Sequence, residues 1–337
     1  MSDPAIAKAA AALDAELAEL LALRSDALAD DLRTRYQLVS WDREQVIGRA
    51  QQRTQALARR KVAPRRGDAV IVYERPSQPL ESLDVVWVWL ERGRQVRLCW
   101  GPDTSEAYLD LVRGLAGQLP VGALTIDTAP LDEMPASAVG VRDAGPRIAL
   151  IDRDADRELA SYVLARTCLR RSGFGPRSVR RALLVGPVDL LRRHLGRLWV
   201  GAQLGPADDP ASFAGPVTAE QCNAYLRACE AWASHEDVEV WSEGGRLQRT
   251  DDHARVYVAP AAFGVTGQIP ALPLVGPMLV VASVDAEQAE AVLAHNAALG
   301  GDAIAIGGPP RDDVVRHVRG ALLIERLPPG LPEPRPV

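Results

Sequence analysis

Four cysteines are the side chains of this sequence best suited to covalent chemistry, because a thiolate is a strong nucleophile. They are Cys99, Cys168, Cys222 and Cys229. Cys168 lies in the run TCLRRSG at the end of a helical pattern and is a candidate nucleophile. A free cysteine is more often a small buried apolar residue, and we favour that interpretation for Cys168 and Cys99. Ser172 and Ser178 have no histidine near them in sequence, so neither indicates a catalytic triad.

Arginines gather in the segment RRSGFGPRSVRR, residues 170–181, which contains five of them and no acidic residue. A guanidinium group binds carboxylate or phosphate through a planar fork of donors. Arg171, Arg177 and Arg180 therefore form a candidate site for a small anion. The alternative is a solvated helix end followed by an arginine, Arg181, with a structural role.

Metal ligands are not grouped in this sequence. Asp152, Asp154 and Asp156 alternate as in a calcium loop, but the central glycine and the final glutamate of such a loop are missing. These aspartates favour a helix N-terminus instead. The five histidines are scattered without partners at metal-ligand spacing. We predict no metal site.

Alternating strands and helices must position these groups. Residues 4–23 and 41–60 have helical periodicity, and from residue 67 onward short apolar runs alternate with amphipathic helices. One such helix, residues 104–117, follows Asp103, a candidate N-cap. Strands separated by helices of this length predict an α/β fold with a parallel sheet.

Residues 128–146 are irregular and mark a boundary between two α/β runs. The second run contains a strand that we expect at residues 238–243, before two glycines. The expected domains are N-terminal helices (1–66), a shortened Rossmann-like domain (67–145), an α/β domain (146–327) and a Pro-rich tail (328–337).

The composition limits the classes of partner that we expect this chain to bind. The chain has 337 residues, 47% of them hydrophobic, and a net charge of −5, so neither nucleic acid nor a membrane surface is an expected partner. No run of 18 uninterrupted apolar residues predicts a membrane span. Four cysteines are too few to stabilise a chain of this length through disulfide bonds, so we expect reduced thiols and a cytoplasmic location.

Several separated motifs resemble the aldehyde dehydrogenase superfamily. They include PRIALIDRDADRELA (146–160), LGPADDPASFAGPVT (204–218) and a long segment from residue 275 to 306. Upstream, PSQPLESL (76–83) and VRLCWGPDT (96–104) resemble the substrate-channel turn and the cofactor-ribose strand. The matching structural motif residues are Arg181, Gly276, Pro277 and Asn296. The resemblance implies a shortened, doubly wound cofactor-type domain followed by an α/β catalytic-type domain.

The same resemblance can be followed to the catalytic positions of the family. Counted without gaps, the nucleophilic cysteine falls on Pro176, and the arginine five residues later falls on Arg181. The general base falls on Gly140, and the oxyanion asparagine falls on Ser77. Proline offers neither a nucleophile nor a backbone N–H.

The cofactor positions are also changed. The lysine that holds the ribose falls on Cys99, and the glutamate on the other side of the ribose falls on Pro273. Residues 128–139 replace the Gly-rich loop and helix that cradle the pyrophosphate. The C-terminal strand that joins subunits in the family is also not expected.

We therefore expect a non-catalytic aldehyde-dehydrogenase-like protein without a cofactor, acting as a structural, regulatory or assembly subunit. It would act with a protein partner or as a homo-oligomer. One alternative is an NAD(P)-dependent oxidoreductase for an aldehyde or acyl thioester, with Cys168 as a relocated nucleophile. Another is a small-anion binding module built on Arg171, Arg177 and Arg180.

Overall fold

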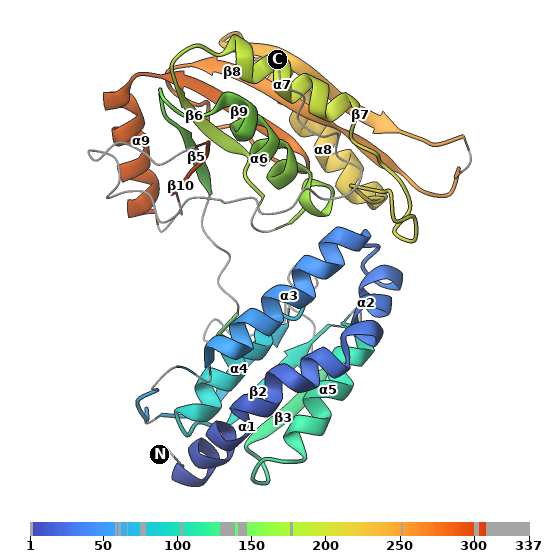
Figure 1. The fold of residues 1–337 in the computed structure, drawn as a ribbon, viewed down its shortest axis with the longest axis vertical. Helices are drawn as coiled ribbons and strands as arrows, with labels where there is room; N and C mark the ends of the chain where they lie inside the picture. The colour runs from blue at the N-terminus through green and yellow to red at the C-terminus, as the bar shows by residue number, and fades with distance from the viewer. Residues whose placement is uncertain are drawn as a thin grey trace. The chain divides into compact units, whose positions relative to one another are not determined.

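The chain forms two compact units, which we describe separately (Figure 1). They comprise Met1–Arg142 and Asp143–Val337. The computed structural model describes residues 3–57, 59, 62–65, 67–74, 79–101, 104–128, 139–140, 147–175, 178–250, 252–299 and 303–307.

A four-stranded parallel sheet is the centre of the first unit. Its strands are β1 (Val70–Glu74), β2 (Val96–Trp100), β3 (Leu124–Thr128) and β4 (Val139–Gly140), in the order β3-β2-β1-β4. This is the first part of the strand order of a doubly wound sheet, and the order reverses between β1 and β4. Helices α4 (Ser82–Glu91) and α5 (Glu106–Ala116) connect β1 to β2 and β2 to β3.

Three N-terminal helices complete the core of this unit. They are α1 (Pro4–Leu23), α2 (Ser25–Thr34) and α3 (Ser40–Leu57). Their buried leucines share one apolar cluster with α4, α5 and the sheet. The fully buried Trp87 of α4 donates a hydrogen bond from its indole to Asp14 of α1, at 2.6 Å. The helices of residues 1–57 therefore pack as part of the sheet's own core.

The opposite face of this sheet is polar near the start of its strands. Arg97 is exposed between two buried residues, Thr125 is exposed next to the buried Leu124, and Arg97 forms an ion pair with Asp127. Strands buried on both faces read as continuous apolar runs, so this alternation indicates solvent on one face of β2 and β3. Cys99, two residues beyond Arg97, is buried.

The second unit contains a six-stranded sheet. Its strands are β5 (Ile148–Ile151), β6 (Arg181–Val185), β7 (Val238–Leu247), β8 (Tyr257–Thr266), β9 (Met278–Val284) and β10 (Ala303–Ala305). The order is β10-β5-β6-β9-β8-β7, with only β7 antiparallel to its neighbour among these strands.

Helices cover both faces of the second sheet. Helices α8 (Ala219–Ala233) and α9 (Ala286–Ala298) share a core with Leu183 and Val185 of β6. Ala182 and Leu184, which point to the other face, are also buried. The other two helices, α6 (Arg157–Leu169) and α7 (Asp189–Val200), pack as a pair, and Ser161 of α6 contacts the Leu191 carbonyl (Figure 1).

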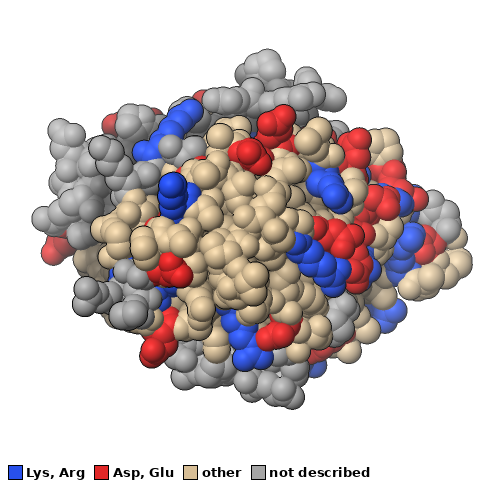
Figure 2. All heavy atoms as spheres, turned by 90° about the horizontal axis from the view of Figure 1, so that it is seen from below, with Lys and Arg blue, Asp and Glu red and all other residues tan. Residues whose placement is uncertain are grey.

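Surface charges are mixed. On the face shown in Figure 2, basic and acidic side chains lie next to one another around an area of other residues. Opposite charges so interspersed produce little long-range field at physiological ionic strength. Among the residues that the structure describes, no helix is both long and apolar enough to cross a bilayer.

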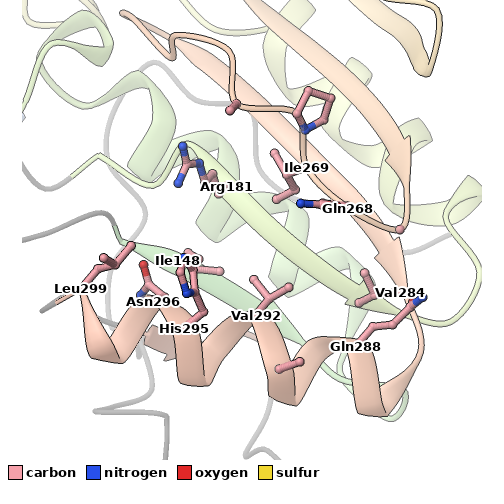
Figure 3. Close-up of a pocket in the computed structure, with 14 residues that line it drawn as sticks. Ile148, Arg181, Gln268, Ile269, Val284, Gln288, Val292, His295, Asn296 and Leu299 are labelled. Carbon is pink, nitrogen blue, oxygen red and sulfur yellow. The ribbon is translucent and has the colours of Figure 1, made fainter.

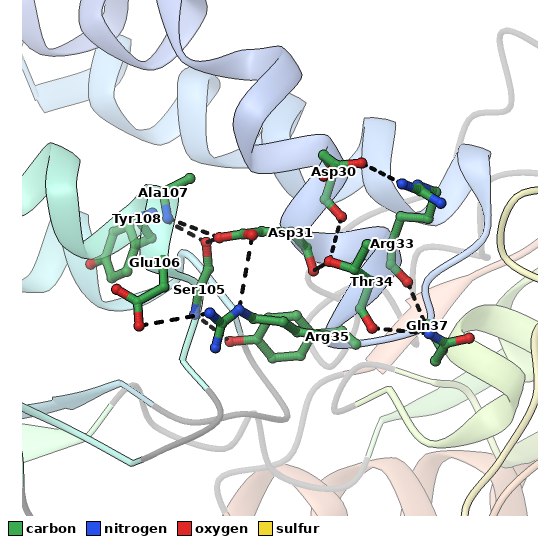
Figure 4. Close-up of polar contacts among 11 residues, drawn as sticks. Asp30, Asp31, Arg33, Thr34, Arg35, Gln37, Ser105, Glu106, Ala107 and Tyr108 are labelled. Carbon is green, nitrogen blue, oxygen red and sulfur yellow. Dashed lines mark hydrogen bonds and ion pairs between the residues drawn. The ribbon is translucent and has the colours of Figure 1, made fainter.

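Helix α2 is fixed to the start of α5 through the Asp31 carboxylate (Figure 4). One Asp31 oxygen accepts hydrogen bonds from the Ser105 hydroxyl and from the Ala107 backbone N–H, both at 2.8 Å. The Ser105 hydroxyl in turn accepts from the Tyr108 N–H at 3.1 Å. The N-cap of α5 is therefore Ser105 and not the predicted Asp103, which lies outside the described residues.

Replacing Asp31 with alanine should destabilise the first unit, because two donors at the start of α5 lose their acceptor. We expect a loss of about 1–3 kcal/mol in the free energy of unfolding. Asp30 is the matched control, since its side chain is 61% exposed and pairs only with Arg33 in the described contacts. Asp30→Ala should change stability by less than about 0.5 kcal/mol. Urea unfolding of both variants checks this, and equal losses would contradict the role given to Asp31.

Candidate functional site

The residues at the expected catalytic positions are divided between the two units. Gly140 ends β4 in the first unit and pairs with Tyr73 of β1. Pro176 belongs to the second unit, but it, Arg177 and Ser77 lie outside the described residues.

The turn before Pro176 is tightly packed. A 3₁₀ turn, Arg170–Gly173, follows α6, and both Arg171 and Ser172 have positive φ, at 50° and 53°. Gly173 has a φ of 80°, and a side chain there would overlap the backbone of Gly276 and Pro277. The GP pair that the family resemblance singled out thus packs directly on this turn.

Arg180 holds the same two segments together. Its guanidinium donates from Nε to the Gly276 carbonyl at 3.1 Å and from Nη2 to the Gly173 carbonyl. Nearby, the Ser172 hydroxyl donates to the Gly215 carbonyl at 2.7 Å. Arg180, one of the three arginines predicted to bind an anion, therefore donates to backbone carbonyls, and Ser172 also has a carbonyl partner.

Cys168 is fully buried in α6. Burial raises the pKa of its thiol to about 12, and the nearby Arg180 charge only partly opposes this shift. A thiol with that pKa is ionised in about one molecule in 10⁵ at pH 7, and the thiolate is the nucleophilic form. The environment of Cys168 is that of a packing residue.

The residues at the two expected cofactor positions are Cys99 and Pro273. Cys99 in β2 is 1% exposed, and burial raises the pKa of its thiol. In the second unit, the Pro273 carbonyl accepts a hydrogen bond from the Trp232 indole at 2.8 Å. Neither side chain offers a charged group to a ribose.

Glu74, at the end of β1, is a buried carboxylate that the sequence analysis did not identify. It is 1% exposed and accepts hydrogen bonds from the backbone N–H groups of Leu80, at 2.6 Å, and Ser82, at 3.1 Å. Leu80 has a φ of 63°, which turns its N–H toward the carboxylate. Burial raises the pKa of Glu74 to about 7, although these hydrogen bonds favour the charged form.

Glu74 and Asp31 both accept backbone hydrogen bonds at the start of a helix. Glu74 accepts from the first residue of α4, and Asp31 accepts from the second residue of α5. In doubly wound folds, phosphates bind to such N–H groups beyond the carboxyl ends of the strands. In this unit, carboxylates of the chain itself occupy the starts of both helices.

No metal centre forms among the residues that the structure describes, which contain no cluster of three or more potential ligands. Asp156 is the N-cap of α6 and accepts from the N–H groups of Glu158 and Leu159. Arg181 and Asn296, two of the motif residues, line a pocket beside α9 instead of the turn.

Comparisons with known proteins show which proteins the chain is similar to. No family model matches the chain. A curated relative, N-succinylglutamate 5-semialdehyde dehydrogenase of Novosphingobium aromaticivorans, is 28% identical over 229 residues. This match covers 64% of the chain and 46% of the relative, so the chain spans about half the length of that enzyme.

Solved structures share the fold. An NAD-dependent aldehyde dehydrogenase from Sinorhizobium meliloti aligns with 94% of this chain and 74% of its own, at a TM-score of 0.76 and 16% identity. A methylmalonate-semialdehyde dehydrogenase from Oceanimonas doudoroffii aligns with 95% of this chain and 78% of its own, at a TM-score of 0.74 and 13% identity. The fold is that of the aldehyde dehydrogenases, in a shorter chain. The chain is thus similar in sequence to an aldehyde dehydrogenase and shares the fold of this superfamily.

The four thiols should be unreactive in the folded protein, because all of them are buried. We expect a disulfide reagent at pH 8 to detect almost no thiol in the native protein and all four after unfolding in urea. Rapid modification of one native thiol that Cys168→Ala abolishes would contradict the packing role of Cys168.

Glu74 should make stability fall as pH rises. Its pKa is about 7 in the folded chain and near its ordinary value of 4.5 in the unfolded chain, so only the folded state keeps the proton between these values. The free energy of unfolding should therefore drop by about 3 kcal/mol from pH 4.5 to 7 on account of this group and stay level above pH 7.

Glu74→Gln is the matched variant, because it keeps the shape of the side chain and removes the titration. Urea unfolding of both proteins at pH 5 and pH 8 isolates the contribution of this residue. The wild-type protein should lose about 3 kcal/mol more than the variant between the two pH values. Equal losses would show that Glu74 has an ordinary pKa in the folded state.

Proposed function

We propose that this chain is a non-catalytic member of the aldehyde dehydrogenase superfamily, a pseudoenzyme that acts as a structural, regulatory or assembly subunit. The observation that carries the proposal is the absence of an ionisable thiol at the turn. Pro176 stands at the nucleophile position, and the nearest cysteine along the chain, Cys168, is a buried thiol with a pKa of about 12.

The size of the expected loss supports this conclusion. By analogy with other covalent catalysts, a nucleophile acting with its base accounts for a factor of about 10⁶ in rate. That factor corresponds to about 8 kcal/mol on the activation barrier. The base position is Gly140, which has no side chain to accept a proton.

The hydrogen bonds at the starts of α4 and α5 are the second support for a non-catalytic role. Glu74 and Asp31 already accept from the N–H groups that begin α4 and α5. An approaching pyrophosphate would have to displace these carboxyl groups, of which Glu74, with a pKa of about 7, carries a negative charge in about half of the molecules at pH 7. The positions of the two ribose ligands hold Cys99 and Pro273. We therefore propose that the chain has no dinucleotide cofactor.

The runner-up function, an oxidoreductase that uses Cys168, is less well supported. The thiol would have to leave its buried position in α6 and ionise before it could attack a carbonyl carbon. The activity in the name of the curated relative is a property of that longer protein. A non-catalytic chain would instead act through a protein partner or a second copy of itself in the cytoplasm.

Turnover by the wild-type chain and by two restored variants tests the proposal. The wild-type chain, Pro176→Cys and the double variant Pro176→Cys/Gly140→Glu are assayed with NAD⁺ or NADP⁺ and a series of semialdehydes. We expect no reduced dinucleotide from any of them, because the restored groups would still lack a bound cofactor. If the wild-type chain transfers hydride and the Cys168→Ala substitution abolishes that transfer, the chain is an oxidoreductase that uses Cys168, and this proposal is wrong.

A further inference from the structure

A pocket of about 630 Å³ lies within the second unit, next to α9 (Figure 3). The side chains of α9 form one wall, and the segment of residues 267–271 after β8 forms the other. Ile148, Arg181 and Val284, from three strands of the sheet, lie between these walls. A cavity of this volume is the size that proteins use for small organic ligands.

Arg181 is the one formally charged side chain among the described residues that line the pocket. Its Nε is buried and has no hydrogen-bond partner in the described part of the chain. Burial lowers the pKa of Arg181, but a guanidinium remains a cation in a protein. The side chain as a whole is half-buried, and a partly desolvated cation without an opposite charge beside it favours an anion there.

Two other arginines of the unit show the contrast. Arg157 donates to the carbonyls of Asp152, Arg153 and Val185 at 2.7 to 3.2 Å. Arg180 donates to two carbonyls at the turn before Pro176. Both guanidinium groups are thus occupied by the fold, whereas Arg181, directly after Arg180, faces a cavity.

The rest of the lining selects the kind of anion. Its polar side chains are neutral amides and an imidazole, at Gln268, Gln288, His295 and Asn296. Most of the remaining lining is aliphatic, including Ile269 and Val292, and the described lining contains no carboxylate. A ligand with one negative charge and an apolar body matches this combination.

The length of the pocket sets the shape of the ligand. Arg181 and Val185 of β6 pair with Val280 and Val284 of β9, so Arg181 and Val284 are separated by four residues along the strands. Four residues of strand span about 13 Å. In Figure 3, Arg181 lies toward the Asn296 end of α9, while Val284 and Gln288 lie at the other end.

We propose that this pocket binds a small aliphatic monocarboxylate, with the carboxylate on Arg181 and the hydrocarbon chain extending toward Val284 and Val292. A carboxylate matches the guanidinium fork and can accept two parallel hydrogen bonds. This site does not use Arg171, Arg177 or Arg180, the arginines predicted from the sequence to bind an anion. It also does not depend on whether the chain is catalytic.

Calorimetry on the full-length chain with octanoate as the probe tests the inference. Octan-1-ol and octylammonium keep the chain length and change the charge, while acetate keeps the charge and removes the chain. Octanoate should bind at least ten-fold more tightly than each of these three compounds. No measurable binding of octanoate at millimolar concentration, or equal binding of octanol, would overturn the site.

Two pairs of variants locate the binding. Arg181→Gln should weaken octanoate binding about ten- to hundred-fold and leave octanol binding unchanged. If that variant does not fold, Ala291→Trp tests whether octanoate binds in the pocket. Ala291 is an exposed residue of the pocket lining, and a tryptophan side chain there would fill the cavity. Its control is Ala298→Trp, an exposed position on the same helix that is not part of the described lining.

Octanoate binding should be lost in Ala291→Trp and retained in Ala298→Trp. Retained binding in both Arg181→Gln and Ala291→Trp would place octanoate elsewhere and overturn the inference. Failure here would not affect the proposed loss of catalysis, which is tested by hydride transfer and not by carboxylate binding.

Discussion

Two buried or half-buried carboxylates organise the first unit of this protein, and much of its proposed behaviour depends on them. Glu74 accepts the N–H groups of the turn that begins α4, and Asp31 reaches from α2 to the start of α5. The first residues of a helix have N–H groups without helical partners, and an anion there is stabilised by the helix dipole. In doubly wound folds a phosphate often serves as that anion. Here the chain supplies carboxyl groups of its own, which tie the N-terminal helix α2 to α5 and occupy these N–H groups.

The second unit keeps the fold of the superfamily while its turn serves packing. Gly173 fits against the backbone of Gly276 and Pro277, and Arg180 donates to a carbonyl on each side of that contact. These interactions need a glycine, a glycine-proline pair and an arginine, but they do not need a nucleophile. Cys168 is buried under the same turn, where the surroundings favour its neutral thiol. Gly276 and Pro277, two of the motif residues, therefore have a structural role that needs no nucleophile at the turn. Arg181 differs from its neighbours, because its guanidinium faces a cavity instead of backbone carbonyls.

The α/β fold and the likeness to aldehyde dehydrogenases could be predicted from the sequence, because apolar periodicity and motif order are local signals. The helix predicted at residues 4–23 is confirmed as α1. Helix α2 was missed, since SDALADDLRT is short and polar and is held by Asp31 and by two buried leucines. Strand β7 was expected to end at residue 243 but continues to Leu247, because Gly244, with a φ of 74°, lets the strand pass the Tyr225 hydroxyl. Glu74 carries no sequence signal, since its partners are backbone N–H groups brought close by a left-handed Leu80. Local patterns cannot report such contacts, and the expectation that Pro176, Gly140 and Cys99 stand at catalytic or cofactor positions came only from the resemblance to a family.

The central claim is that the starts of α4 and α5 are closed to a dinucleotide. Calorimetric titration of the full-length chain with NAD⁺ and NADH, beside an active aldehyde dehydrogenase as the positive control, tests it most directly. The account predicts no saturable heat from this chain up to millimolar dinucleotide, while the control binds at its usual affinity. Saturable binding at micromolar concentration, accompanied by quenching of the chain's tryptophan fluorescence, would contradict the account.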